Sequence, residues 1–93
     1  MRFAGQLGVM ITILYFARLR ETLGTASEQI ALPAGASDLK SLRALLRERG
    51  GVWTEEMADG KPVRAAVNQD IANGDSRIVD GDEIAFFPPV TGG

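Results

Sequence analysis

Two segments in the first third of the chain are rich in β-branched and aromatic residues, which favour extended structure. The first is residues 10–16, MITILYF, and the second is residues 27–32, SEQIAL, which Pro33 ends. The connection over residues 17–26 contains Gly24 and is short enough for a hairpin. The pattern therefore predicts two paired strands at the start of the domain.

Leucines at helical spacing follow a loop over residues 33–37. They fall at positions i, i+3, i+6 and i+7 and form one apolar stripe: Leu39, Leu42, Leu45 and Leu46. Ser37 is expected to be the N-cap of this helix, with Asp38 in the first turn near the positive helix end. Gly50-Gly51 is expected to end the helix, and the stripe is expected to form the core.

Short apolar segments alternate with turn-forming residues in the second half of the chain. Residues 52–62 are acidic and show no period, so they predict an irregular loop that Trp53 anchors. Strands or strand fragments are expected at residues 63–68, 71–72 and 83–87. Turns are expected at residues 68–70, 73–75 and 80–82, the last two around the apolar pair Ile78-Val79. Pro88-Pro89 is expected to end the last strand.

These elements predict an α+β domain, in which one main helix lies on one face of a mixed sheet of four to five strands. One helix cannot cover both faces of such a sheet, so the other face stays open. The first and last strands are expected to pair in parallel at the centre of the sheet, as the helix-containing connection between them allows.

Side-chain alternation along the two central strands sorts their residues onto the two faces. The residues expected beneath the leucine stripe are Ile11, Ile13, Tyr15, Ile84 and Phe86. The residues expected on the open face are Thr12, Leu14, Phe16, Ala85 and Phe87, with Ile71 close to them. Exposed aromatic side chains on a small domain favour docking of a protein partner. The alternatives are a loop folded over these residues or a register shifted by one residue.

Composition limits the chemistry that this chain can perform. Its 93 residues allow one domain, and none of them is Cys or His. A disulfide, a Cys/His zinc site, a Cys nucleophile and a Ser-His-Asp triad are therefore excluded, and no bound metal is expected. The absence of disulfides favours the reducing cytoplasm. No apolar run approaches the roughly 20 residues of a membrane span, so no membrane association is expected.

Charge is distributed unevenly along the chain. The net charge is -2, with seven Arg/Lys and four Asp/Glu in residues 1–50 against three and eight in residues 51–93. The basic residues lie mostly on one predicted helix, as expected of a solvated helix face, whereas nucleic acid requires a continuous basic surface. We therefore expect no nucleic-acid partner.

The last six residues, Pro88 to Gly93, reach roughly 20 Å when they are extended. Two prolines stiffen the base of this tail, whereas Gly92-Gly93 has no side chains and could thread a narrow channel. The carboxylate of a terminal glycine is ionised at neutral pH and is unhindered. It could attack a nucleotide phosphate to give an acyl-adenylate, which a sulfur or nitrogen nucleophile then displaces.

Five motifs of the chain carry a family signature. They are Met10 to Ala17, Arg20-Glu21, Gly24, Ala65 to Gln69, and Asp80-Gly-Asp-Glu-Ile-Ala-Phe-Phe-Pro-Pro-Val-Thr-Gly-Gly93. Together they resemble the molybdopterin synthase small-subunit family, whose members are ubiquitin-like β-grasp sulfur carriers. The resemblance implies a β-grasp domain over residues 10–87 and an extended tail over residues 88–93. Residues 1–9 depart from the family pattern and are expected to be an N-terminal extension, with Met1 and Met10 both open as the start.

The resemblance implies a sulfur carrier that acts within a complex, is not an enzyme alone and binds no cofactor. An E1-like adenylyltransferase would use ATP to adenylate the carboxylate of Gly93, and a sulfur donor would convert it to a thiocarboxylate. The tail would then enter the large synthase subunit, within a 2+2 heterotetramer, and sulfur would pass to cyclic pyranopterin monophosphate. The implied residues are Gly93 as the covalent site, Gly92, Thr91, Val90, Pro89 and Pro88 as the tail, and Phe16, Ile71 and Phe87 as docking residues.

Three other functions stay open at this point. A carrier for thiamine thiazole synthesis or tRNA thiolation would share the chemistry up to the last transfer, although the Phe-Phe-Pro-Pro-Val-Thr segment argues against it. A β-grasp binding module would use no covalent step at Gly93. An independent enzyme would depend on carboxylates such as Asp80, Asp82 and Glu83, which turn formation and solvation explain more simply.

Overall fold

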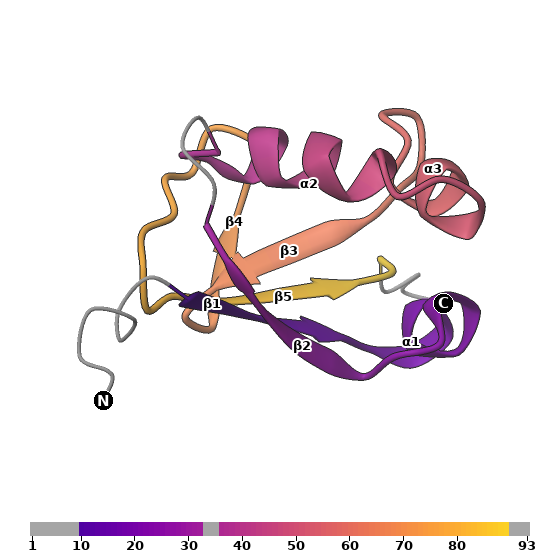
Figure 1. Ribbon diagram of the computed structural model, residues 1–93, viewed down its shortest axis with the longest axis horizontal. Helices are drawn as coiled ribbons and strands as arrows, with labels where there is room; N and C mark the ends of the chain where they lie inside the picture. Colours follow the sequence, from indigo (N-terminus) through magenta and orange to yellow (C-terminus); the bar gives the residue numbers. More distant parts are fainter. Residues whose placement is uncertain (1–9, 33–35, 90–93) are drawn as a thin grey trace.

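The computed structural model describes residues 10–32 and 36–89. Its elements in chain order are β1 (Met10–Tyr15), α1 (Ala17–Leu23), β2 (Ser27–Ala31), α2 (Leu39–Arg47), α3 (Val52–Glu56), β3 (Arg64–Val67), β4 (Asp70–Ala72) and β5 (Glu83–Phe87). The strands form one sheet in the order β2-β1-β5-β3-β4 (Figure 1). β1 and β5 pair in parallel at its centre, which confirms the prediction, and the other neighbours are antiparallel.

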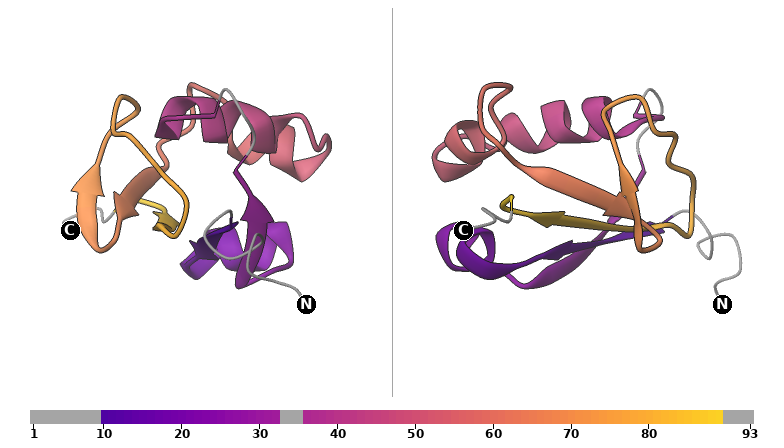
Figure 2. Two further views of the ribbon diagram at one scale, coloured as in Figure 1. Left: turned by 60° about the vertical axis from the view of Figure 1, so that its left-hand side comes forward. Right: turned by 180° about the vertical axis from the view of Figure 1, so that it is seen from behind.

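The core lies on one side of this sheet, where α2 and α3 pack (Figures 1 and 2). Ile13 pairs with Ile84 and Tyr15 with Phe86 across the central strands. The five strand residues expected beneath the leucine stripe are at most 1% exposed: Ile11, Ile13, Tyr15, Ile84 and Phe86. Leu39, Leu42 and Leu46 are buried against them, and Leu45 is partly buried. Both the face assignment and the stripe are therefore confirmed.

The expected hairpin connection over residues 17–26 is wrong, because this segment contains α1. Leu19 and Leu23 lie four positions apart and are buried in the core, so one helical turn buries two large side chains. Gly24 then ends the helix in the left-handed region, at φ 79°, and its N–H donates to the carbonyl of Arg20. A helix of seven residues is marginal alone, and this packing stabilises it.

The expected irregular loop over residues 52–62 begins with a short helix, α3, so this prediction is also wrong. Trp53 packs against the core, as expected of an anchor, and Met57 is fully buried. Glu56 is 6% exposed and forms an ion pair with Arg18 of α1 at 3.3 Å. Contacts between residues far apart in the sequence therefore stabilise both short helices, α1 and α3.

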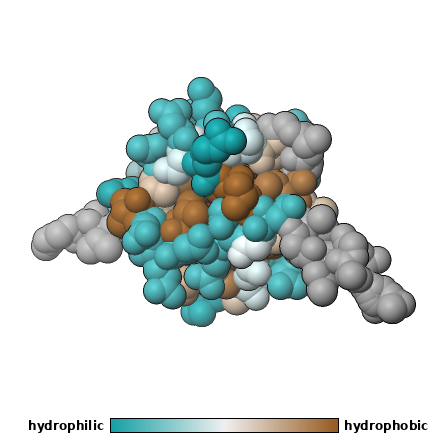
Figure 3. Space-filling model, turned by 90° about the vertical axis from the view of Figure 1, so that its left-hand side faces the viewer, coloured by the Kyte–Doolittle hydropathy of each residue, from teal (hydrophilic) through white to brown (hydrophobic). Residues whose placement is uncertain are grey.

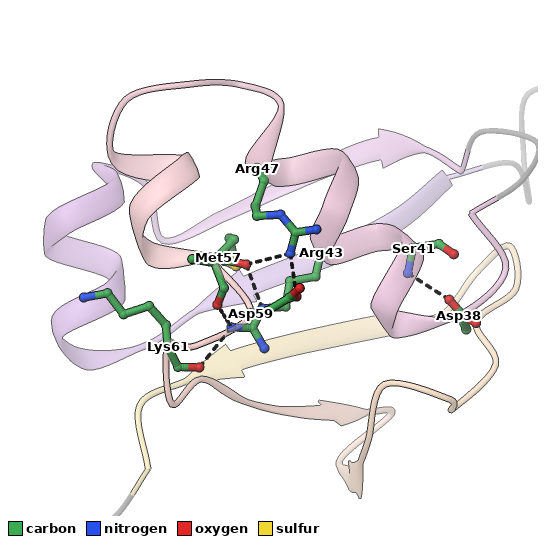
Figure 4. Close-up of polar contacts among 8 residues, drawn as sticks. Asp38, Ser41, Arg43, Arg47, Met57, Asp59 and Lys61 are labelled. Carbon is green, nitrogen blue, oxygen red and sulfur yellow. Dashed lines mark hydrogen bonds and ion pairs between the residues drawn. The ribbon is translucent and has the colours of Figure 1, made fainter.

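Helix α2 begins one residue after the expected position, because Asp38 rather than Ser37 is its N-cap. The Asp38 carboxylate accepts a hydrogen bond from the Ser41 backbone N–H at 2.8 Å (Figure 4), and hydrogen bonding by Ser41 lowers the pKa of Asp38. The first two backbone N–H groups of the helix, those of Leu39 and Lys40, donate to the carbonyls of Ser76 and Gly74. The loop after β4 is thereby tied to the start of α2.

Two arginines of α2 hold the segment that follows α3 (Figure 4). Arg43 donates hydrogen bonds to three backbone carbonyls, those of Met57, Ala58 and Lys61. Arg47 donates to the Met57 carbonyl and forms an ion pair with Asp59 at 3.0 Å. These side chains donate hydrogen bonds to backbone carbonyls that follow the end of α3 and have no helical partner. The expectation that the basic face of α2 is merely solvated is therefore wrong here.

A polar cluster closes the core beside the edge strand β2. The Glu28 carboxylate accepts two hydrogen bonds from Arg49, each 2.9 Å, and one from the Tyr15 hydroxyl at 2.7 Å. The Arg49 guanidinium also lies 4.4 Å from the centre of the Trp53 ring. Burial acts to raise the pKa of Glu28, but the hydrogen bonds from Arg49 and Tyr15 outweigh it and lower the pKa.

This cluster predicts an acid-sensitive contribution to stability. Because the pKa of Glu28 in the folded chain lies below its ordinary value of 4.5, its ionised form stabilises the fold above that pH. The stabilisation is lost as the pH falls through the lowered pKa. In urea unfolding at stepped pH, Glu28→Gln should therefore lose less stability on acidification than the wild type. The matched variant Glu55→Gln, at an exposed carboxylate, should lose as much as the wild type, and equal losses in the two variants would contradict the prediction.

Candidate functional site

The second face of the sheet carries no helix among residues 10–32 and 36–89 (Figure 2). Strand register aligns one row of apolar side chains across four strands of this face: Leu14, Ala85, Ala66 and Ile71. Ile71 is 66% exposed. Toward the centre of the sheet, Leu14 and Ala85 are partly exposed and Ala66 is buried. The prediction that one face of the sheet is left without a helix is therefore confirmed for the described residues.

Two aromatic residues extend the apolar row toward the end of β5. Phe16 follows β1 with extended backbone, and its N–H donates to the Phe86 carbonyl at 3.1 Å. Since Tyr15 faces the core, alternation places Phe16 on the open side, where it is 46% exposed. Phe87 lies on the same side at the end of β5, because Phe86 faces the core. Phe16 and Phe87 thus share one end of the open face, and Ile71 lies on the β4 edge.

The tail begins directly beyond Phe87. Pro88 and Pro89 follow β5 and are partly exposed. The other expected tail residues, Val90, Thr91 and Gly92, and the expected covalent site Gly93 lie outside the described residues. The described structure therefore joins the aromatic end of the open face to the base of the tail without an intervening element.

The opposite end of the open face is polar. Thr12 of β1 is the register partner of Glu83, and the Gln29 side chain donates to the Thr12 hydroxyl at 3.2 Å. The backbone N–H of Glu83 donates to the Asn68 side chain at 3.0 Å, and the Asn68 N–H donates to the Glu83 carbonyl at 2.8 Å. Asn68 has a positive φ of 50° in the predicted turn between β3 and β4, and its hydrogen bonds to Glu83 hold this turn beside the start of β5.

One charged side chain beside the aromatic end was not predicted from the sequence. Arg64 is the register partner of Phe87, and it therefore lies on the open face, where it is exposed. The pairing of β3 with β5 brings these residues together across 23 positions of sequence. The position has no local motif, so only the strand register could reveal it.

Apolar surface also gathers around the end of the molecule that carries β4 and the loop over residues 73–82 (Figure 3). Three large apolar side chains from these segments and the start of β1 are exposed: Ile71 at 66%, Val79 at 56% and Met10 at 37%. Gly81 N–H donates to the Met10 carbonyl at 2.8 Å, which holds the loop against β1. The exposed apolar surface thus extends beyond the open face itself.

The helix-covered side has a hollow of about 420 Å³ between α2 and the β3–β4 pair. Its sheet wall includes two small register partners, Ala65 and Ala72. The carboxylate at its rim, Asp59, is already paired with Arg47. Within the described residues, no group of three acidic side chains could hold a metal ion. None of the helices in that part of the chain is long and apolar enough to span a membrane.

Comparison with known proteins identifies relatives over nearly the whole chain. The ThiS family model matches residues 13–93. The molybdopterin synthase sulfur carrier subunit of Escherichia coli is 43% identical over 84 residues, which cover 90% of this chain and 100% of that protein.

Solved structures show the same arrangement. A candidate molybdopterin converting factor, subunit 1, from Pyrococcus furiosus is 28% identical with a TM-score of 0.71, covering 88% of this chain and 99% of that chain. A chain in the complex of subunits 1 and 2 of molybdopterin-converting factor from Helicobacter pylori is 29% identical with a TM-score of 0.60, covering 90% and 99%. These likenesses confirm the ubiquitin-like β-grasp fold expected from the sequence.

Adjacent phenylalanines on opposite faces give a direct test of this arrangement. Phe86→Ala should lower the free energy of unfolding by about 3–5 kcal/mol, because it leaves a cavity in the core. Phe87→Ala and Phe16→Ala should each cost about 1 kcal/mol or less, since these rings lie on the open side. Urea unfolding measures all three variants. A loss at Phe87 as large as that at Phe86 would show that the two faces are wrongly assigned.

Proposed function

Because this chain belongs to the ThiS family, we propose that it is the sulfur-carrying subunit of a molybdopterin synthase and that the carboxylate of Gly93 carries the sulfur. The likeness to the Escherichia coli subunit over 90% of this chain supports this assignment. The structural observation that supports the assignment best is the position of Phe87, which joins the open face directly to the base of the tail. A partner bound to that face would receive the tail.

The chemistry takes place at the end of the tail. A carboxylate oxygen of Gly93 attacks the α-phosphorus of ATP, and pyrophosphate leaves, which gives an acyl-adenylate bound to this chain. An E1-like adenylyltransferase catalyses this step. Hydrosulfide supplied by a donor then attacks the acyl carbon and displaces AMP, which leaves a thiocarboxylate. This chain has no Cys, so the sulfur must come from another protein or molecule.

The large synthase subunit then completes the reaction. Phe16, Ile71 and Phe87 dock on it, and the residues from Pro88 to Gly93 enter its active site. The thiocarboxylate passes its sulfur to cyclic pyranopterin monophosphate, and two such transfers build the dithiolene of molybdopterin. The catalytic groups belong to the large subunit, and two copies of each chain form the assembly. The solved complex of subunits 1 and 2 from Helicobacter pylori supports a large-subunit partner.

Carriers for thiamine thiazole synthesis and for tRNA thiolation share the first two steps and differ in the acceptor. The relatives named for molybdopterin synthase, at 43% and 38% identity, favour the pterin as acceptor. The protein that co-purifies with this chain separates these functions, because transfer to the pterin precursor requires the large synthase subunit as the partner.

Intact-mass measurement tests the covalent step. Incubation with ATP, the activating enzyme and a sulfur donor should shift the mass by the replacement of one oxygen by one sulfur, and fragmentation should place the change at Gly93. A variant with one alanine added after Gly93 is the matched control, since it should keep the fold and the docking face but form no functional thiocarboxylate. Deletion of Gly92-Gly93 should likewise leave the melting temperature unchanged. An unmodified wild-type mass under these conditions would contradict the proposal.

A further inference from the structure

The open face carries two charged residues among its described strand positions, and they lie at opposite ends. Arg64 starts β3 and is the register partner of Phe87, beside the base of the tail. Glu83 starts β5 and is the register partner of Thr12 in the polar half. Glu83 and Phe87 are four positions apart on one strand, so the two charges are separated by about 13 Å along the strand direction.

Neither charge is neutralised within the described part of the molecule. Arg64 is exposed, Glu83 is partly exposed, and no ion pair joins either of them to another described residue. The described strands carry two other charged residues, Glu28 and Asp70. Both pair with residues on the core side of the sheet, so neither belongs to the open face. A row of apolar side chains lies between Arg64 and Glu83: Leu14, Ala85, Ala66 and Ile71.

Burial of such a face against a partner removes water from both charges. A charge that loses water without gaining a counter-charge weakens binding, so we expect the partner to present a carboxylate opposite Arg64 and a cation opposite Glu83. A partner turned end for end would place like charges together. An apolar row alone would allow the partner to bind in either of two opposite directions. Arg64 and Glu83 favour one of these directions over the other.

From this arrangement we infer that Arg64 and Glu83 set the direction in which the large synthase subunit docks, so that the tail points into its active site. The inference rests on the proposed function, which supplies the partner. The partner surface is apolar at its centre, with a carboxylate near the mouth of the tail channel and a cation about 13 Å away along the strand direction. Arg64 and Glu83 are positioning residues, because neither touches the reacting atoms.

Charge reversal tests this inference with the full chain and the purified large subunit. Arg64→Glu and Glu83→Lys should each raise the Kd by about tenfold or more and slow association, with a smaller penalty at high salt. Arg64→Leu should weaken binding less than Arg64→Glu, because it removes the charge without adding a repulsive one. Lys40→Glu is the matched control, since α2 lies on the other side of the sheet, and it should change the Kd by about twofold or less.

Two readouts separate this inference from a structural effect and from the proposed function. The melting temperatures of the Arg64 and Glu83 variants should stay within about 2–3 °C of wild type, because both side chains are on the surface. Equal Kd values for Arg64→Glu and Lys40→Glu, with wild-type binding intact, would overturn the inference alone. Failure of the wild-type chain to bind the large subunit would overturn the proposed function, and the inference with it.

Discussion

The parallel pairing of β1 with β5 joins the two ends of the domain at the centre of the sheet, and the other features depend on its register. Ile13 lies beside Ile84 and Tyr15 beside Phe86, so large apolar side chains of both strands share one face. Since side chains alternate with period two, a shift by one residue would move this whole set to the opposite face. The same register that builds the core also decides which residues stay outside it.

Arginines complete the enclosure of a core that has helices on one side only. Arg49 neutralises Glu28 beside the edge strand, and Arg43 and Arg47 satisfy carbonyls of the segment after α3. Arg43 and Arg47 of α2 both bind the Met57 carbonyl, whereas Arg49, just after α2, binds Glu28 of β2. In a chain of 93 residues without cysteine, such charge-assisted hydrogen bonds connect elements that disulfides connect in many small secreted domains.

The two faces of the sheet have separate tasks in a sulfur carrier. The helix-covered face stabilises the domain, whereas the open face carries Phe16, Ile71 and Phe87, the residues proposed to dock a partner, and continues into the tail through Pro88. We therefore expect substitutions at neighbouring positions, such as Phe86 and Phe87, to affect stability and docking separately. In the proposed docking, the charges at the two ends of the open face give direction to a surface whose apolar row has none.

Local patterns in the sequence determined most of the fold: the strand segments, the leucine stripe, the turns and the assignment of side chains to two faces. These depend on periods of 2 and 3.6 residues, which a single segment displays by itself. The chemistry expected of the Gly-Gly tail remains a prediction from residue types and from the family resemblance. Only the tertiary structure decided that residues 17–23 and 52–56 are helical, because helices this short need distant packing partners. It likewise decided that Arg64 lies beside Phe87, because strand pairing joins residues that no local pattern connects.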